Sequence, residues 1–252
     1  MVQKLKSALK NPPLRLALKA ALFGSALFWV RAGGFASDPS VGGAGPLLFF
    51  ALFSFLLYFR RIQRPAFFGS FLVLLCAAVT TLFFLKSAWL VAAGIAFFVL
   101  IFVLLLGTKD LVFANRPAIF YAAVNLLFLA VFSLFFLAEK TSYFFVEYFA
   151  VFTASFLLLK DTLNFMAPYF PRRHLLIAAV AALAVAELAW AAALLPLGFI
   201  NSAALLLMTV FIIGDFSLRH LNGALKSAAV FRAAAVFAVF LAIIFFSSRW
   251  GP

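Results

Sequence analysis

Residues 175–213 read LLIAAVAALAVAELAWAAALLPLGFINSAALLLMTVFII and contain one charged side chain, that of Glu187. As a single helix this stretch would be roughly 58 Å long at 1.5 Å per residue, about twice the thickness of the hydrocarbon layer of a bilayer. Pro196 and Gly198 interrupt the stretch, and a helix does not continue through such a pair. The stretch therefore predicts two membrane helices joined by a tight turn.

The same pattern of apolar stretches separated by short polar segments covers the whole chain of 252 residues. Hydrophobic residues make up 67% of the sequence, charged residues make up 11%, and the mean hydropathy is +1.19. A soluble protein of this length cannot bury so much apolar surface. We predict an all-α, polytopic transmembrane helix bundle that forms a single integral membrane domain over residues 1–252, with a short basic N-terminal segment (1–13) and no soluble domain. The nine predicted spans are 14–30, 41–59, 66–85, 88–106, 117–138, 142–159, 175–195, 197–213 and 228–246.

The first of these spans is the least apolar. Its apolar centre covers only residues 20–30 and follows a basic segment, as in a signal peptide. A cleaved signal peptide and a helix lying in the interface are the alternatives, and either would leave eight membrane helices. We favour an uncleaved crossing in which Lys19 extends back to the cytoplasmic interface.

The distribution of basic residues predicts the orientation. With the N-terminus inside, fifteen Lys and Arg residues fall on the cytoplasmic side and four fall outside, and cytoplasmic loops accumulate basic residues. The four tryptophans fall at or near the outer interface, where indole rings are favoured. Topology therefore explains the net charge of +13 better than nucleic-acid binding does. We expect a multi-pass protein of the cell (inner) membrane with its C-terminus outside.

Basic residues at the cytoplasmic face also predict a lipid partner. The N-terminal segment and residues 172–174, which include His174, would lie at anionic lipid head groups. The acids of this face, Asp110, Asp161 and Asp215, are interpreted as loop acids paired with adjacent basic groups. His174 and His220 are too far apart in sequence to indicate a metal site. The single cysteine, Cys76, is interpreted as a small core or lipid-facing residue.

Three polar residues are predicted in the outer half of consecutive helices: Glu147, Glu187 and Asn201. An ionisable group inside a membrane indicates a functional site, and two converging carboxyl groups would suit a proton relay or a cation site. Each glutamate can instead be buried in its protonated form as a hydrogen-bonding link between helices. In both cases we expect the glutamates to face the protein interior, because an ionisable group facing hydrocarbon costs at least ~2.5 kcal/mol.

The C-terminal third carries three segments that support a resemblance: Glu187-Leu188-Ala189-Trp190, Leu195-Pro196-Leu197 and Arg219-His220-Leu221-Asn222-Gly223. They resemble segments of a family of multi-pass membrane proteins from candidate-phylum bacteria that has no assigned activity. The resemblance implies a membrane location and no catalysis. It also implies that Glu187 and the 219–220 segment belong to a recurring unit.

Three functions are open to such a chain. The first hypothesis is a transporter-like or channel-like protein in which Glu147 and Glu187 line a polar path from the outer side. The second is a non-catalytic subunit or scaffold that packs against other membrane proteins or against a second copy. An intramembrane enzyme is third, since the sequence has no haem-binding histidine pair and no phosphate-binding glycine loop, and no cofactor is predicted. A transporter needs a hydrated cavity that reaches the glutamates, whereas a subunit can bury them without water.

Overall fold

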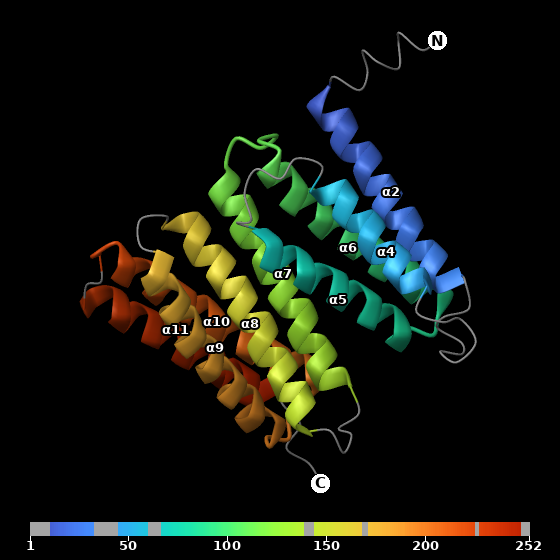
Figure 1. The fold of residues 1–252 in the computed structure, drawn as a ribbon. Coiled ribbons are helices and arrows are strands. Elements are labelled where there is room, and N and C mark those ends of the chain that lie inside the picture. The colour runs from blue at the N-terminus through green and yellow to red at the C-terminus, as the bar shows by residue number, and fades with distance from the viewer. Residues whose placement is uncertain are drawn as a thin grey trace, which may run out of the picture. The chain divides into compact units, whose positions relative to one another are not determined.

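The computed structural model describes residues 11–32, 45–59, 67–138, 144–167, 171–224 and 227–247. Over these residues the chain forms helices and no strand, which confirms the predicted all-α fold (Figure 1). The helices are α2 (Pro12–Ala32), α4 (Gly45–Tyr58), α5 (Phe68–Phe84), α6 (Ala88–Lys109), α7 (Arg116–Leu137), α8 (Phe144–Met166), α9 (Pro171–Ala193), α10 (Phe199–Leu221) and α11 (Ser227–Ser247). Most of the basic N-terminal segment, together with Lys140, Arg249 and Trp250, lies outside the described residues.

Six of these helices are long and apolar enough to cross a membrane, namely α2, α6, α7, α8, α9 and α10. The other apolar helices are α4, α5 and residues Val230–Ile244 of α11, and they are shorter. At 1.5 Å per residue, the 14 residues of α4 extend about 21 Å, less than the ~30 Å of hydrocarbon in a bilayer. The chain is therefore a multi-pass membrane protein with six full-length candidate spans.

The predicted breaks between spans are confirmed. Helices α5 and α6 stop on either side of Lys86-Ser87, because a charged side chain is costly at the bilayer centre. Helix α9 begins at Pro171, where the missing N–H of proline leaves no hydrogen bond unmade. The 175–213 stretch turns between Ala193 and Phe199, as the proline and glycine of that segment predict.

Helices α8 and α10 extend about two turns beyond their predicted ends, which corrects the interpretation of two acids as loop residues. Helix α8 continues to Met166 and contains Asp161, which is buried. Helix α10 continues to Leu221, and Asp215 accepts a 2.7 Å hydrogen bond from Arg219 one turn later. The predicted ends followed the last apolar residue, but a helix continues wherever its polar side chains find partners along it.

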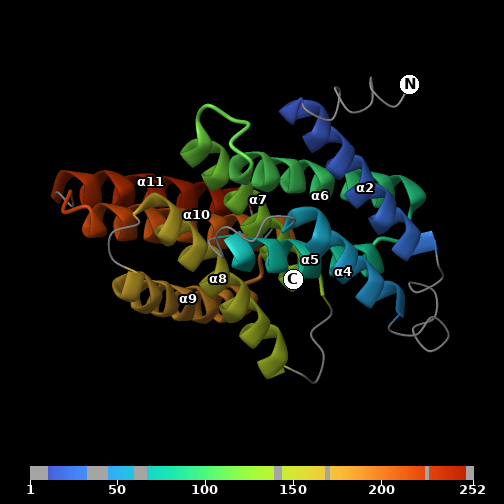
Figure 2. The ribbon, with the colours of Figure 1, turned by 45° about the horizontal axis from the view of Figure 1, so that its top comes forward.

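The chain divides into two compact units, Met1–Ala123 and Val124–Pro252, and the residues of α7 are shared between them. In the first unit α2 packs along α6 and against α4 and α5, and α5 packs against α6 (Figure 2). Its core is aromatic. Phe23 of α2 stacks on Phe102 of α6 with ring centroids 4.3 Å apart, and Tyr58 of α4 stacks on Phe71 of α5 at 4.4 Å.

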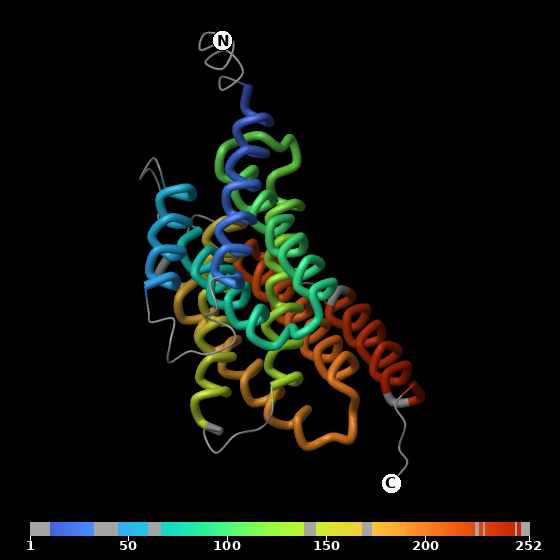
Figure 3. Tube along the Cα trace, turned by 90° about the vertical axis from the view of Figure 1, so that its right-hand side faces the viewer, coloured from blue at the N-terminus to red at the C-terminus, as the bar shows by residue number. Residues whose placement is uncertain are grey.

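In the second unit α8 packs along α9, α9 along α10, and α10 along α11. The tube of Figure 3 shows α10 and α11 side by side at the red end of the chain. The buried face of α9 consists mainly of small side chains, which allow neighbouring helix backbones to approach closely. These residues are Ala178, Ala181, Ala182, Val185, Ala189 and Ala192.

The turn between α9 and α10 gives a first prediction. Gly198 is exposed, has extended backbone dihedral angles, and has no heavy atom within 4 Å of an added Cβ. In a Cys76→Ala background, Gly198→Cys should fold and react with a membrane-impermeant maleimide added outside the cell. Ser202→Cys, at a buried position one turn later, is the matched control and should not react. Equal protection of both cysteines in folded protein would contradict a turn at the membrane surface.

Candidate functional site

The structure places two of the three predicted polar residues in first helical turns. Glu147 lies in the first turn of α8 and Asn201 near the start of α10, and both are half-buried. Neither is at the exposed surface of its helix, so both remain candidates for polar contacts within the second unit.

Glu187 lies on the exposed surface of α9 instead. Its carboxyl group makes no hydrogen bond or ion pair with another residue that the structure describes. The expectation that Glu187 faces the protein interior is therefore wrong. The reason is helical geometry, because Val185 and Ala189 are each two residues away and hence roughly 200° around the helix. These two residues are fully buried, so Glu187 points to the opposite side.

The contact between α8 and α9 shows that Glu147 and Glu187 lie at similar depths along the helix pair, although they differ in burial. His174 Nδ1 lies 3.0 Å from Asn164 Oδ1 and fixes the register of these antiparallel helices. Glu187 follows His174 by as many residues as Val151 precedes Asn164, so Glu187 and Val151 lie at the same depth in this helix pair. Val151 is about 6 Å, or one turn, from Glu147. Glu147 is half-buried with its Oε2 atom buried, whereas Glu187 is exposed, so the two residues do not form a shared interior site.

Glu187 belongs to a continuous exposed face of α9, here called the Glu187 face. Its members recur at alternating intervals of four and three residues, and every one of them is exposed. The face consists of Leu176, Val180, Leu183, Glu187 and Trp190, followed by Leu194 just after the helix. Glu187 is the only charged residue in this set. The sequence identifies Glu187 as a polar candidate but does not identify the exposed face around it, although the four-three spacing is visible there.

The His174–Asn164 contact also corrects the placement of His174 at lipid head groups. His174 is 1% exposed, and its Nε2 has no hydrogen-bond partner among the residues described. On α8, Asp161 and Thr162 are buried at the same end of the helix pair. The His174–Asn164 contact therefore links α8 to α9 at the end opposite Glu187, where Asp161 and Thr162 are also buried. A lone histidine in a basic segment gives no sequence signal for such burial.

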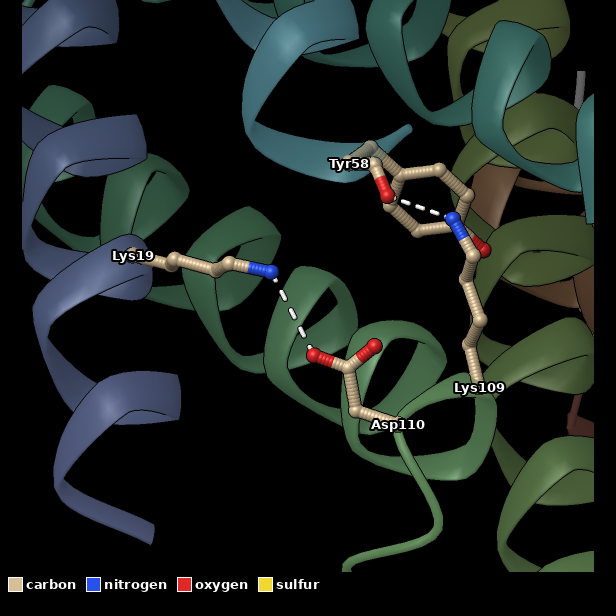
Figure 4. A network of polar contacts seen from close by, with 4 residues as sticks. All are labelled: Lys19, Tyr58, Lys109 and Asp110. Atoms are coloured by element: carbon tan, nitrogen blue, oxygen red, sulfur yellow. Dashed lines mark hydrogen bonds and ion pairs between the residues drawn. The ribbon is translucent and has the colours of Figure 1, made fainter. Parts of the chain in front are cut away.

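The first unit contains a second polar network, where the C-terminal ends of α4 and α6 lie near Lys19 of α2 (Figure 4). Lys19 of α2 is 7% exposed, and its Nζ lies 3.3 Å from Asp110 Oδ2. The neighbouring Lys109 donates a hydrogen bond to the backbone carbonyl of Tyr58 at the end of α4. Its ammonium also lies over the rings of Tyr58 and Phe59, 4.3 and 4.4 Å from their centroids. Two adjacent residues thus attach α6 to two different helices.

Helix α6 ends at these two residues. The N–H of Asp110 still donates to Leu106, but Leu111 has a positive φ of 62° and the N–H of Val112 donates back to Gly107. This left-handed residue ends the helix in the way that glycine usually does. The C-terminal carbonyls of α4 lie at the negative end of its dipole, where the Lys109 ammonium is favourable.

These arrangements hold helices together and carry no evident catalytic group. No cluster of three or more His, Cys, Asp or Glu residues that could hold a metal ion occurs within the described ranges. Cys76 is exposed on α5. Comparisons with protein-family models, with curated proteins and with solved structures find no match. The function must therefore be inferred from the residues of this chain.

The Lys19–Asp110 pair gives a second prediction. Asp110→Asn should destabilise the protein by about 1–3 kcal/mol, because it leaves the buried Lys19 ammonium without its counter-charge. The loss is below that of a fully buried pair because the Asp110 side chain is 35% exposed. Thermal unfolding in detergent measures it. Asp215→Asn breaks the exposed pair with Arg219 and is the control, with an expected change of about 0–1 kcal/mol. Equal stability of the two variants would show that the Lys19–Asp110 pair stabilises the protein no more than the exposed Asp215–Arg219 pair does.

Proposed function

We propose that this protein is a non-catalytic subunit of a membrane complex and that it binds another membrane helix through the Glu187 face. The observation that supports this proposal is the exposed carboxyl group of Glu187 within an otherwise apolar surface. A second helix packed on that face would cover Glu187 and supply it with a polar contact.

The free-energy cost of a carboxyl group that faces lipid favours a Glu187 face that another helix covers. Facing lipid, an ionisable side chain costs at least ~2.5 kcal/mol on insertion scales, and interior polar residues of membrane proteins pair with one another or with backbone carbonyls. Glu187 has no such partner among the described residues. The buried side of α9 is already occupied by its alanines and cannot turn toward lipid without exposing the contacts with α8 and α10.

The transport hypothesis is less well supported by this geometry. It requires Glu147 and Glu187 to reach one hydrated path inside the bundle, and Glu187 faces away from the packed side of α9. Glu147, half-buried near the start of α8, remains a candidate for a polar path of its own. An enzymatic function has no observation in its favour.

We further propose that the protein lies in the cell membrane with its N-terminus inside, on the fifteen-to-four distribution of basic residues. The ends of the helices that carry Lys19, Asp110 and His174 are then cytoplasmic, and Glu187 lies in the outer half of the bilayer. Arg173 and Arg219 are exposed at the proposed cytoplasmic ends, where they can contact anionic lipid head groups.

Photo-crosslinking in the native membrane tests the proposed subunit role. Benzoylphenylalanine in place of Leu183, within the face, should give a discrete protein adduct that weakens when Glu187→Leu is added. The same substitution at Leu52, another exposed leucine, on α4, is the control and should give no such adduct. Adducts with lipid alone at Leu183 would refute the proposal.

A water-accessibility measurement separates the subunit role from transport. In a Cys76→Ala background, Glu187→Cys should react slowly with an impermeant methanethiosulfonate added outside, because a covering helix excludes water. Fast reaction, comparable with that of Gly198→Cys, would indicate a hydrated path to Glu187 and would favour the transport hypothesis.

A further inference from the structure

We propose that Arg31 and Lys86 form a binding site for the headgroup phosphate of an anionic phospholipid, at the end of the first unit that the proposed topology places outside. This site involves only residues of the first unit and is independent of the Glu187 face. Three features of the two residues support it: their proximity, the lack of a described acid beside them, and their depth in the membrane.

The packing of α2 along α6 brings the two basic residues together (Figure 2). Lys19 pairs with Asp110 at one end of these antiparallel helices. At the other end, Arg31 Nη2 donates a 3.3 Å hydrogen bond to the carbonyl of Leu85, which follows the last residue of α5. Lys86 is the next residue of the chain. Two cationic side chains that are far apart in sequence therefore adjoin at the turn between α5 and α6.

No described acid of the first unit neutralises this pair. Asp110 is the only acid among the residues of this unit that the structure describes, and it lies at the far end of α6, about 33 Å away by the helical rise. Lys86 is exposed and makes no hydrogen bond or ion pair with another described residue. Arg31 is half-buried and directs one of its five N–H donors to Leu85. Adjacent like charges repel, and an anion bound between them removes that repulsion.

The start of α6 adds positive potential beside the pair. Ser87 precedes the first residue of this helix and makes no capping hydrogen bond with its side chain. The N–H of Val91 donates to the carbonyl of Ser87, so the N–H groups of the three residues before Val91 have no acceptor within the helix. Such N–H groups, together with the positive end of the helix dipole, favour a negatively charged group at this place.

The pair is also unexpected on this side of the membrane. The proposed outer side carries only four basic residues in the whole chain, and two of them are Arg31 and Lys86. Basic residues that serve only to orient a membrane protein accumulate on the cytoplasmic side. Binding of an anion gives a reason for two basic side chains to meet on the opposite side.

The depth of the pair matches that of a lipid headgroup. Helix α6 extends about 33 Å, slightly more than the ~30 Å of hydrocarbon, so its ends reach the headgroup layers. Trp29 and Trp89 are 49% and 81% exposed at this same end, and indole rings favour that interface. Arginine can bind a phosphate group through two parallel hydrogen bonds, and lysine adds a point charge. Because both side chains are cationic, they favour an anionic headgroup over a zwitterionic one, whose ammonium group they repel.

Quenching of tryptophan fluorescence by brominated lipid tests the site. In a Trp190→Phe, Trp250→Phe background, only the two tryptophans at this end fluoresce. The purified protein is reconstituted in phosphatidylcholine bilayers that contain brominated phosphatidylglycerol or the same fraction of brominated phosphatidylcholine. Phosphatidylglycerol should quench more strongly, and a high salt concentration should reduce the difference. Equal quenching by the two lipids at low salt would overturn the proposal.

Variants of the two basic residues test their part in the binding. Arg31→Gln and Lys86→Gln should each weaken the binding of phosphatidylglycerol about five-fold, the effect expected for one cationic side chain at a membrane surface. Lys86→Arg keeps the charge and should retain binding. Arg232→Gln removes an exposed basic residue of α11 and is the matched control, with no expected change. Since Lys86 has no described polar contact to lose, undiminished binding by folded Lys86→Gln would overturn the proposal even if Arg31→Gln fails to fold.

Two other counter-charges can be distinguished in the same assay. Asp38 is the only acid between α2 and α4, in a segment outside the described residues. A preference for phosphatidylglycerol that appears only in Asp38→Asn would assign the basic pair to Asp38 and overturn the proposal. An excess of inorganic phosphate at constant ionic strength should leave the preference unchanged, because acyl chains hold the lipid headgroup at this depth. Loss of the preference would assign the site to a soluble phosphate and would likewise overturn the proposal.

Discussion

Every charged or strongly polar side chain that enters a helix bundle in a membrane needs a polar partner, and this chain meets that constraint in different ways in its two units. In the first, Lys19 pairs with Asp110, and Lys109 binds the carbonyl of Tyr58 between two aromatic rings. In the second, His174 contacts Asn164. Glu187 has no such partner among the residues described, and this difference makes its face the strongest candidate for an interaction site.

Helix α9 is built with two unlike faces, which explains why the exposed one cannot simply be turned inward. Alanines such as Ala178 and Ala182 let α9 approach its neighbours closely, and close approach is what drives helix association when apolar burial gives no advantage over lipid. Replacing them with the larger Leu183 or Trp190 side chains would separate the helices. Packing within the chain therefore fixes the orientation of Glu187.

The sequence predicts the elements of this structure well because prolines and charges act locally. Lys86-Ser87 and Pro196 end helices wherever the chain places them, since neither can continue an apolar span. The contacts could not be predicted in the same way. Lys19 and Asp110 are 91 residues apart, and no local pattern pairs them. The cost of exposing a carboxyl group predicts Glu187 inside, but the small alanine side chains of α9 occupy its buried side instead.

The cost of an exposed Glu187 also links assembly to stability. A chain whose Glu187 carboxyl group faces lipid is less stable, because an ionisable group in hydrocarbon is costly. A partner that binds only the folded state adds to stability by mass action, so the folded fraction depends on the concentration of the partner. The residue that weakens the isolated chain is then the one that specifies its assembly.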